Sequence, residues 1–314
     1  MSKNLAIIVP AYKGRFLDAA LDSLARQSCK DFTCYIGDDC SPDDIRGISS
    51  RYAGRMDLVY RRFESNLGAS DLVKHWERCI ELASEPYILL FSDDDVLPYD
   101  IVERFVKTLG QYPSAELFRM QLAVIDGDGS LLKSTPPLST GRADARSILC
   151  DKLYGKTATA ACEYIFSAAL YRRSGGFVHF PHAWCSDDAS WFRMGVEAGG
   201  AVSLPGLPVL WRNVSGSNIS DSHEYDRDKE TATAQFLGHL YDCYPEIRDR
   251  SFARALYAYI KCILSVSLGR RCSKEGFSEI SSALARFSAL QAAKIRIKYG
   301  LRLSFGLAGY KFRP

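Results

Sequence analysis

The chain has 314 residues, of which 47% are hydrophobic and 25% are charged, and its formal net charge is +3 at pH 7. This composition is ordinary for a globular protein and excludes an intrinsically disordered chain, while the small net charge gives no reason to expect a nucleic-acid-binding protein. The length allows one large hydrophobic core, or one core with a smaller appendage.

Ten cysteines are spread along the sequence without a C-x-x-C pair or a Cys/His cluster at zinc-binding spacing. We therefore expect free thiols in a reducing compartment. Residues 1–4 lead directly into a short apolar segment and lack the features of a secretory signal. No stretch approaches the roughly 18 apolar residues of a membrane span. These observations predict a cytoplasmic protein.

The first third of the chain alternates between predicted strands and predicted helices. Short apolar runs typical of buried strands occupy residues 5–9, 32–37, 58–62 and 87–91. Each is followed by a predicted helix, at residues 16–24, 42–52, 66–83 and 101–109. Such strand–helix units predict parallel strands with right-handed crossovers, and hence an α/β fold with a Rossmann-like sheet. The fingerprints of a dinucleotide-binding turn and of a P-loop are both missing from the sequence.

The last of these strands ends in three consecutive carboxylates, Asp93, Asp94 and Asp95. Ligands of open α/β sheets bind at the carboxyl ends of strands, and adjacent aspartates repel one another unless a positive group joins them. A divalent cation meets this need, since carboxylate oxygens suit Mg²⁺ and Mn²⁺. The alternative is a polar turn that caps the next helix. Because a cap needs only one aspartate, we favour the metal site.

The pattern changes in the middle of the chain. A strand predicted over residues 117–125 leads into Asp126-Gly127-Asp128-Gly129. This motif predicts a hairpin turn rather than a calcium loop, because no glutamate stands at the twelfth position. A turn is expected over residues 172–177. Further strands are expected at residues 163–170, 201–204 and 208–211.

A second acidic pair, Asp187 and Asp188, opens a predicted helix whose Phe192 and Val196 would face the core. Aspartates at a helix start are common caps, because they accept backbone hydrogen bonds and interact favourably with the helix dipole. Spacing alone therefore leaves two interpretations open, a functional site and a simple cap.

The remainder of the chain is predicted to be a loop over residues 212–220 followed by helices from Tyr225 onward. Arg212 could lie over a phosphate, or the loop could be a plain surface connection. From Arg286 to the end there are seven Lys and Arg residues and no Asp or Glu. Two interpretations of this basic tail stay open: contact with an anionic inner membrane leaflet, and a solvated helix face or unpacked chain end.

Four features follow one another in order along the chain. They are Val9-Pro10-Ala11-Tyr12, then Asp38-Asp39-Cys40-Ser41, then Asn66-x-Gly68 with Ser92-Asp93-Asp94-Asp95, and finally Gly175-Gly176-Phe177 followed by Asp187-Asp188. In this order and spacing, residues 4–220 resemble the family 2 glycosyltransferases of the GT-A fold, inverting enzymes that build bacterial polysaccharides. The resemblance implies a GT-A type catalytic domain over residues 1–220, with a mixed sheet flanked by helices, and a helical region with the basic tail over residues 221–314.

The resemblance also implies roles for individual residues. Asp188 would be the catalytic base that removes the proton of the attacking acceptor hydroxyl. Asp95, together with Asp94, would hold the Mn²⁺ or Mg²⁺ that offsets charge on the diphosphate as the sugar departs. The residues implied to bind the nucleotide are Pro10, Ala11, Tyr12, Asp39, Asn66, Asp93, Asp94 and Arg212.

The donor implied by the family is a nucleotide sugar, by default a UDP-sugar, and the acceptor is a saccharide hydroxyl. A lipid-linked saccharide, as in capsule or lipopolysaccharide O-antigen assembly, would suit a protein peripheral to the inner face of the cell membrane. The chain departs from the family pattern at Asp187, where Glu is usual, and at Cys40, where Gly is usual. It also has Lys74-His75-Trp76 where many members carry Arg-Asn.

Two other readings compete with a glycosyltransferase. A sugar-nucleotide nucleotidyltransferase would need a glycine-rich basic loop after the first strand, and residues 10–14 make a poor one. A non-catalytic partner in a polysaccharide assembly complex would keep the fold. That reading predicts an unchanged product yield after Asp188→Asn, whereas the transferase reading predicts loss of turnover.

Overall fold

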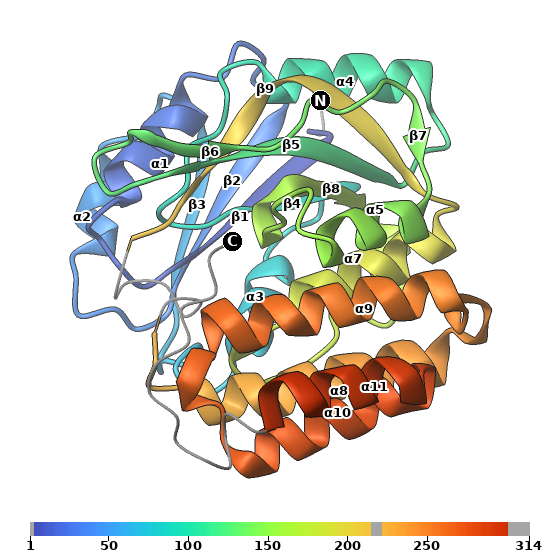
Figure 1. Cartoon of the computed structure of the whole chain (residues 1–314). Coiled ribbons are helices and arrows are strands. Elements are labelled where there is room, and N and C mark those ends of the chain that lie inside the picture. Colours follow the sequence, from blue (N-terminus) through green and yellow to red (C-terminus); the bar gives the residue numbers. More distant parts are fainter. Residues whose placement is uncertain (1–2, 215–221, 301–314) are drawn as a thin grey trace. The chain divides into compact units, whose positions relative to one another are not determined.

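The computed structural model describes residues 3–214 and 222–300 (Figure 1). Within these ranges the chain forms two compact units. The first holds a β-sheet and comprises residues 3–152, 156–179 and 186–214. The second is largely helical and comprises residues 153–155, 180–185 and 222–300. The domain boundary predicted after residue 220 lies outside the described residues.

The strands of the first unit form one mixed sheet. Over the described residues its order is β3-β2-β1-β4-β8-β5-β9-β7, with β6 paired to β5. β1 to β4 are mutually parallel, β5 and β9 are parallel, and β8 runs antiparallel between β4 and β5. The carboxyl ends of β1, β2 and β4 therefore lie at one edge, as predicted. The strands are β1 (Leu5–Ala11), β2 (Phe32–Asp38), β3 (Asp57–Arg62), β4 (Tyr87–Leu90), β5 (Leu117–Ile125), β6 (Leu131–Ser134), β7 (Arg142–Ala143), β8 (Tyr164–Ser167) and β9 (Ala201–Arg212).

Both faces of the central strand β1 are buried. Leu5, Ile7 and Val9 belong to a core cluster with residues of α1 and α4, while Ala6 and Ile8, which point to the opposite face, are equally buried. Helices thus cover a parallel sheet, which explains the continuous apolar run in β1. The helices in this part of the chain are α1 (Leu17–Ala25), α2 (Ile45–Ser50), α3 (Leu72–Ile80), α4 (Ile101–Gln111), α5 (Ala145–Leu153), α6 (Ala168–Arg173) and α7 (Ser186–Glu197).

The strand predicted over residues 163–170 is wrong in its second half. β8 ends at Ser167, whose hydroxyl accepts a hydrogen bond of 2.9 Å from the Leu170 N–H and caps α6. A short apolar run cannot be assigned to strand or helix by periodicity alone, and alanines favour the helix once a cap is present. α6 also replaces the first half of the turn predicted over residues 172–177.

The two strands predicted around residue 205 are one strand, β9. Its pairing with β5 shifts register between Met120 and Leu122, opposite the exposed Pro205 and Gly206, so the proline and glycine interrupt the ladder without ending the strand. Val196 is 41% exposed, so its predicted place in the core is also wrong. The hairpin turn after β5 is confirmed, because β6 pairs with β5 in antiparallel fashion.

The second unit is built mainly from four described helices. α8 packs on α10, and α9 packs on α10 and α11. These helices are α8 (Asp226–Cys243), α9 (Arg250–Cys262), α10 (Lys274–Phe287) and α11 (Ala289–Ile295). Across the described ranges no helix is both long and apolar enough to cross a bilayer. Residues 301–314 of the predicted basic tail lie outside the described residues, whereas all ten cysteines lie within them and carry free thiols.

Candidate active site

Asp93 joins the end of β4 to the end of β1. Its Oδ2 accepts hydrogen bonds from the backbone N–H groups of Tyr12 (2.8 Å) and Lys13 (2.9 Å). Tyr12 is 38% exposed, while Ala11 is buried and Pro10 is half-buried. Burial raises the pKa of Asp93, and the two N–H donors oppose that rise. Two segments predicted to serve the nucleotide site are therefore adjacent at the carboxyl edge of the sheet.

Asp94 and Asp95 lie in an environment that disfavours their ionised forms. Asp95 is fully buried: its Oδ1 accepts the backbone N–H of Arg212 at 2.8 Å, and its Oδ2 has no hydrogen-bond partner among the described residues. Burial raises the pKa of Asp95 to about 6, and the Arg212 N–H, the Cys162 thiol and the Ser92 hydroxyl oppose the rise. Burial and the charges of both neighbouring aspartates raise the pKa of Asp94 to about 8. Both carboxylates would be stabilised by an added positive charge.

The same two carboxylates are the oxygen donors expected for Mn²⁺ or Mg²⁺. In the parts of the chain that the structure covers, no three His, Cys, Asp or Glu side chains converge into a complete ligand set. These ions commonly bind through one or two carboxylates and complete their coordination with water and substrate phosphates. The buried, unpartnered Oδ2 of Asp95 and the raised pKa values are what such a cation would offset. Asp94 and Asp95 therefore fit the predicted ion.

Arg212, at the end of β9, is 5% exposed and holds the surrounding backbone together. Its Nε donates to the carbonyl oxygen of Asp94 at 2.8 Å, and Nη1 donates to the carbonyl oxygens of Asp126 (2.8 Å) and Gly127 (3.1 Å). The guanidinium also lies over the Phe16 ring, 4.5 Å from its centre. This geometry gives Arg212 a positioning role beside the acidic cluster, while its predicted contact with phosphate stays a prediction.

Asp39 follows β2 and is 2% exposed. Its oxygens accept the backbone N–H groups of Leu67 and Gly68, each at 2.8 Å, and pair with the Arg78 guanidinium. A methyl group on Gly68 would come within 2.6 Å of Asp39 Oδ2, so the close approach requires glycine. Asn66 closes the same turn by accepting a backbone hydrogen bond of 3.0 Å. Asp39 therefore fixes this turn, and its predicted contact with the base or ribose remains a prediction, as does that of Asn66.

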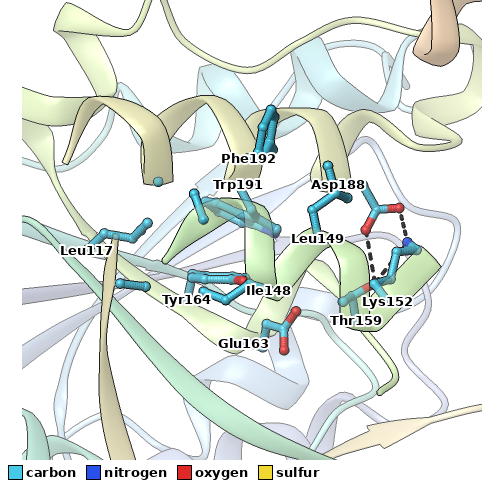
Figure 2. A pocket seen from close by; sticks show the side chains of 13 residues that line it. Leu117, Ile148, Leu149, Lys152, Thr159, Glu163, Tyr164, Asp188, Trp191 and Phe192 are labelled. Carbon is cyan, nitrogen blue, oxygen red and sulfur yellow. Dashed lines mark hydrogen bonds and ion pairs between the residues drawn. The ribbon is translucent and has the colours of Figure 1, made fainter. Parts of the chain in front are cut away.

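Asp188 lies in the first turn of α7 and is 7% exposed. Figure 2 shows its carboxylate beside Lys152 and Thr159: Oδ1 accepts the Thr159 hydroxyl at 2.9 Å, and Oδ2 pairs with the Lys152 ammonium, which also donates to Thr159 at 2.9 Å. Asp187 accepts the N–H of Asp188 at 2.9 Å, and burial and the Asp188 charge raise the pKa of Asp187 to about 7. The partners of Asp188 thus come from two other segments of the chain, and its predicted role as the catalytic base stays a prediction.

A small cavity lies next to Asp188, lined by Glu163 and Trp191 among others (Figure 2). Its volume of about 20 Å³ suffices for about one water molecule. Glu163 Oε1 and Trp191 Nε1 are buried and have no hydrogen-bond partner within the described ranges. Burial raises the pKa of Glu163 to about 8; Arg119, 3.4 Å away, opposes the rise and the Asp188 charge adds to it. The neutral form of Glu163 is thereby favoured near pH 7.

Of two consecutive residues, Cys162 interacts with the acidic cluster after β4 and Glu163 interacts with Asp188. Burial and the charge of Asp95 raise the pKa of the Cys162 thiol, which is close enough to hydrogen-bond Asp95. The next residue, Glu163, is influenced by the charge of Asp188. Acidic groups that are far apart in the sequence thus approach neighbouring residues of one segment within the first unit.

A family comparison covers most of this unit. The model of "Glycosyl transferase family 2" matches residues 6–174, more than half of the 314 residues. The chain belongs to glycosyl transferase family 2. The matched region contains the segments that end in residues 10–12, Asp39 and Asp93 to Asp95, and it ends before α7.

Two family 2 relatives show how much of the chain is shared. The poly(ribitol-phosphate) beta-N-acetylglucosaminyltransferase TarS of Staphylococcus aureus is 24% identical over 140 residues, which are 43% of this chain and 24% of TarS. A PGL/p-HBAD biosynthesis glycosyltransferase of Mycobacterium tuberculosis is 29% identical over 117 residues, which are 36% of this chain and 44% of the relative. The chain thus matches less than half the length of either.

Solved structures extend the similarity to nearly the whole chain. S. aureus TarS 1–349 superposes with a TM-score of 0.70 at 15% identity, covering 96% of this chain and 89% of that one. The complex of TarS 1–349 with UDP-GlcNAc gives 0.69 at 16% identity, covering 94% and 83%. The mannosyltransferase PcManGT of Pyrobaculum calidifontis, in complex with GDP-Man and Mn²⁺, gives 0.52 at 16% identity, covering 96% and 81%. The expected GT-A type α/β fold is confirmed.

Several residues of the site could not be identified from the sequence motifs. Lys152 and Thr159 contact Asp188, Arg78 pairs with Asp39, and Glu163 lines the cavity. None of them belongs to the motifs that carry the family resemblance. Lys152 stands in the last turn of an ordinary amphipathic helix, where a basic residue is common, so no local signal distinguishes it.

Proposed function

We propose that this protein is an inverting glycosyltransferase that moves a sugar from a nucleotide diphosphate sugar, in the simplest case a UDP-sugar, to a saccharide hydroxyl. Membership of family 2 supports transfer of a sugar, and two neighbours of the same fold were solved with UDP-GlcNAc and with GDP-Man. Two relatives are named as a poly(ribitol-phosphate) beta-N-acetylglucosaminyltransferase and as a PGL/p-HBAD biosynthesis glycosyltransferase. The acceptor in this proposal is a saccharide or a lipid-linked saccharide.

The observation that carries the proposal is the presence of two acidic groups with different environments in one compact unit. On the donor side, Asp94 and Asp95 are buried carboxylates that a cation would stabilise. On the acceptor side, Asp188 is a carboxylate whose oxygens contact an ammonium group and a hydroxyl, and a carboxylate can serve as a general base. One group suits a diphosphate with its metal ion, and the other suits a hydroxyl proton.

The reaction then needs one displacement. Asp188 accepts the proton of the acceptor hydroxyl while that oxygen forms a bond to the anomeric carbon. The bond from the anomeric carbon to the diphosphate breaks on the opposite face, and its electron pair leaves with the diphosphate, so the configuration inverts. A bound Mn²⁺ or Mg²⁺ would supply Lewis-acid stabilisation of the charge on the diphosphate. Asp94 and Asp95 would hold that ion, and Arg212 would keep Asp94 and the turn after β5 in place.

The remaining donor contacts are assigned from the sequence motifs and their positions. Residues 10–12, Asp39, Asn66 and Asp93 would form the nucleotide site, with Asp39 and Asn66 acting through the turn that they hold. The partly exposed Tyr12 would line the base pocket. Nε and Nη1 of Arg212 already donate to carbonyl oxygens, so its contribution to donor affinity is the least direct of these.

A peripheral contact with the inner face of the cell membrane is part of the proposal. Lys294 and Arg296 are exposed, and Ile297 beside them is 71% exposed, so basic and apolar side chains occur together before residue 301. Each Lys or Arg near an anionic surface contributes about 1 kcal/mol to binding. Co-sedimentation with anionic vesicles at low and high salt tests this; no binding at low salt contradicts it.

The test of the proposed activity starts from donor binding. Thermal shifts should be measured with a panel of UDP-, GDP- and TDP-sugars, with and without Mn²⁺, because a ligand that binds the folded state raises its melting temperature. The donor with the largest metal-dependent shift is then used for transfer to saccharide acceptors, and the anomeric configuration of the product is read by NMR. We expect metal-dependent release of the nucleoside diphosphate and inversion. A product of retained configuration, or no release from any donor, contradicts the proposal.

A further inference from the structure

The ammonium group of Lys152 occupies an unusual place for a lysine. Its side chain is only 17% exposed and stands between the Thr159 hydroxyl and the Asp188 carboxylate (Figure 2). These three residues come from the last turn of α5, from the loop before β8 and from the first turn of α7. Lysines are rarely buried unless they are paired, because removing the ammonium from water is costly. Its position therefore needs a reason.

Apolar packing already joins the two helices that this ion pair bridges. A Cβ added to Gly195 of α7 would lie 2.9 Å from the Ala145 Cβ of α5, so the two backbones approach closely there. Leu149 of α5 and Phe192 of α7 are buried and line the same cavity. Apolar packing and the Lys152 pair thus both link α5 to α7, and what the pair adds to packing is its charge.

The local charge balance offers a better account. Three carboxyl groups meet here, those of Glu163, Asp187 and Asp188, together with the cations of Lys152 and Arg119. The Lys152 charge counteracts the burial that raises the pKa values of Glu163 and Asp187. Without that ammonium, close carboxyl groups in a buried site retain protons instead of remaining ionised.

We propose that Lys152 is a positioning residue of the transfer reaction: its ammonium, held by Thr159, lies against the Asp188 carboxylate and orients it to receive the acceptor's proton. This inference rests on the proposed function. The Thr159 hydroxyl fixes Oδ1 and the ammonium fixes Oδ2, so the carboxylate cannot rotate freely. A carboxylate has about four lone-pair positions, so one partner on each oxygen leaves room for a substrate hydroxyl.

The pH dependence of turnover separates this role from a structural one. The variants are Lys152→Met, Lys152→Arg and Thr159→Val, with Lys156→Met as the matched control, because Lys156 makes an exposed ion pair with Asp151 at 2.9 Å. Release of nucleoside diphosphate from the donor chosen above is measured from pH 5 to pH 10 with Mn²⁺. The groups that face Asp188 and can affect its profile are Lys152, Asp187, Glu163 and Arg119.

We expect K152M to move the acidic limb of the pH–kcat profile up by about one to three pH units, the usual effect of an opposite charge at this range. On the acidic side of the wild-type limb, turnover then falls about ten- to thousand-fold and recovers at higher pH, with the donor KM within about twofold. K152R should keep the limb near the wild-type position, T159V should move it up measurably but by less than about one unit, and K156M should leave it unchanged.

An unmoved acidic limb in K152M, or a limb moved equally in K152R, overturns the inference while leaving the proposed function intact. Melting curves establish that each variant folds; if K152M does not fold, an unmoved limb in T159V overturns the inference instead. If the wild-type protein releases no nucleoside diphosphate from any donor, the proposed function fails and this inference fails with it.

Discussion

The end of β4 and the start of α7 both carry consecutive aspartates, but the chain surrounds them differently. Asp95 meets a backbone N–H on one oxygen and has no hydrogen-bond partner on the other among the described residues, and the pKa values of Asp94 and Asp95 are raised. Asp188 meets a hydroxyl on one oxygen and an ammonium on the other. One acidic cluster suits an added cation, whereas the other already has a cation supplied by the chain.

This difference is set by residues far away in the sequence. The sequence favoured a metal site for the three aspartates after the strand and left the two at the helix start open between a site and a cap, and only the tertiary partners show how the two groups differ. Substitutions that remove charge from each group in turn, without changing its shape, should therefore have distinct signatures.

Asp188→Asn should remove the proton-accepting group on the acceptor side. The amide keeps the shape of the carboxylate but cannot take a proton, so turnover should fall about 10³-fold while donor affinity is retained. Transfer rates and thermal shifts with the donor measure the two effects. Asp151→Asn, at an exposed carboxylate paired with Lys156, is the control and should retain full activity. Undiminished turnover in D188N would show that Asp188 is not the catalytic base.

Asp95→Asn tests the donor end. The amide oxygen can still accept the Arg212 N–H, but the charge offered to a cation is lost, so we expect about 10²-fold weaker activity that rises with added Mn²⁺. Calorimetric Mn²⁺ titration in the presence of UDP gives a readout independent of turnover. Asp128→Asn, on the exposed hairpin turn, is the matched control. Equal Mn²⁺ affinity in D95N and the wild type would place the ion elsewhere.

Arg212→Gln should sharpen the comparison by separating positioning from phosphate binding. Loss of donors to three carbonyl oxygens and of the contact with Phe16 should lower the free energy of unfolding by about 2 kcal/mol. Denaturant titration measures this loss. If Arg212 acts only by holding the backbone in place, the donor KM should rise in proportion to the loss of stability. A large rise in KM with unchanged stability would instead support direct contact with phosphate.

Glu163→Gln should produce the smallest change, in the pH dependence of stability. The folded-state pKa of Glu163 is raised from 4.5 to about 8, so the folded state binds its proton more tightly than the unfolded state does. Stability contributed by this group is full below pH 4.5 and is lost as the pH rises toward 8. E163Q removes this loss, so its stability relative to the wild type should improve by about 2 kcal/mol between pH 5 and pH 8.

The control for that prediction has the opposite sign. Hydrogen bonding to Arg173 lowers the pKa of Glu116, so the stability that Glu116 contributes builds up as the pH rises to about 4.5 and is full above that pH. Glu116→Gln should therefore be less stable than the wild type by a constant amount above about pH 4.5. Melting temperatures across the pH range measure both variants. Parallel wild-type and E163Q curves would show that Glu163 is ionised in the folded state.

The local sequence pattern was sufficient to predict the strands that position the site. Continuous apolar runs identified β1, β2 and β4, and the rule that parallel strands end at one edge predicted that Asp93 would lie near residues 10–12. Element ends were less predictable. The apolar residues 168–170 fit strand and helix equally well, and only the Ser167 hydroxyl bonded to the Leu170 N–H decides between them.

The charged partners could not be predicted, for a physical reason. A lysine in the last turn of α5 and an arginine at the end of β9 have the same local sequence signals whether they face solvent or the interior. That Lys152 reaches Asp188, 36 residues later, depends on how α5 and α7 pack. Arg212 turns toward carbonyl oxygens of residues more than 80 positions earlier, which no periodicity encodes.

The close approach of Gly68 to Asp39 sets a size limit at this position. Even one extra carbon atom would have to displace a carboxylate that is held by Arg78 and by two backbone groups. In a library with all twenty amino acids at residue 68, selection for a correctly folded loop should return almost only glycine. Engineers who wish to reshape this rim of the protein therefore have freedom at Ala69 and Ser70, which are exposed, and none at residue 68.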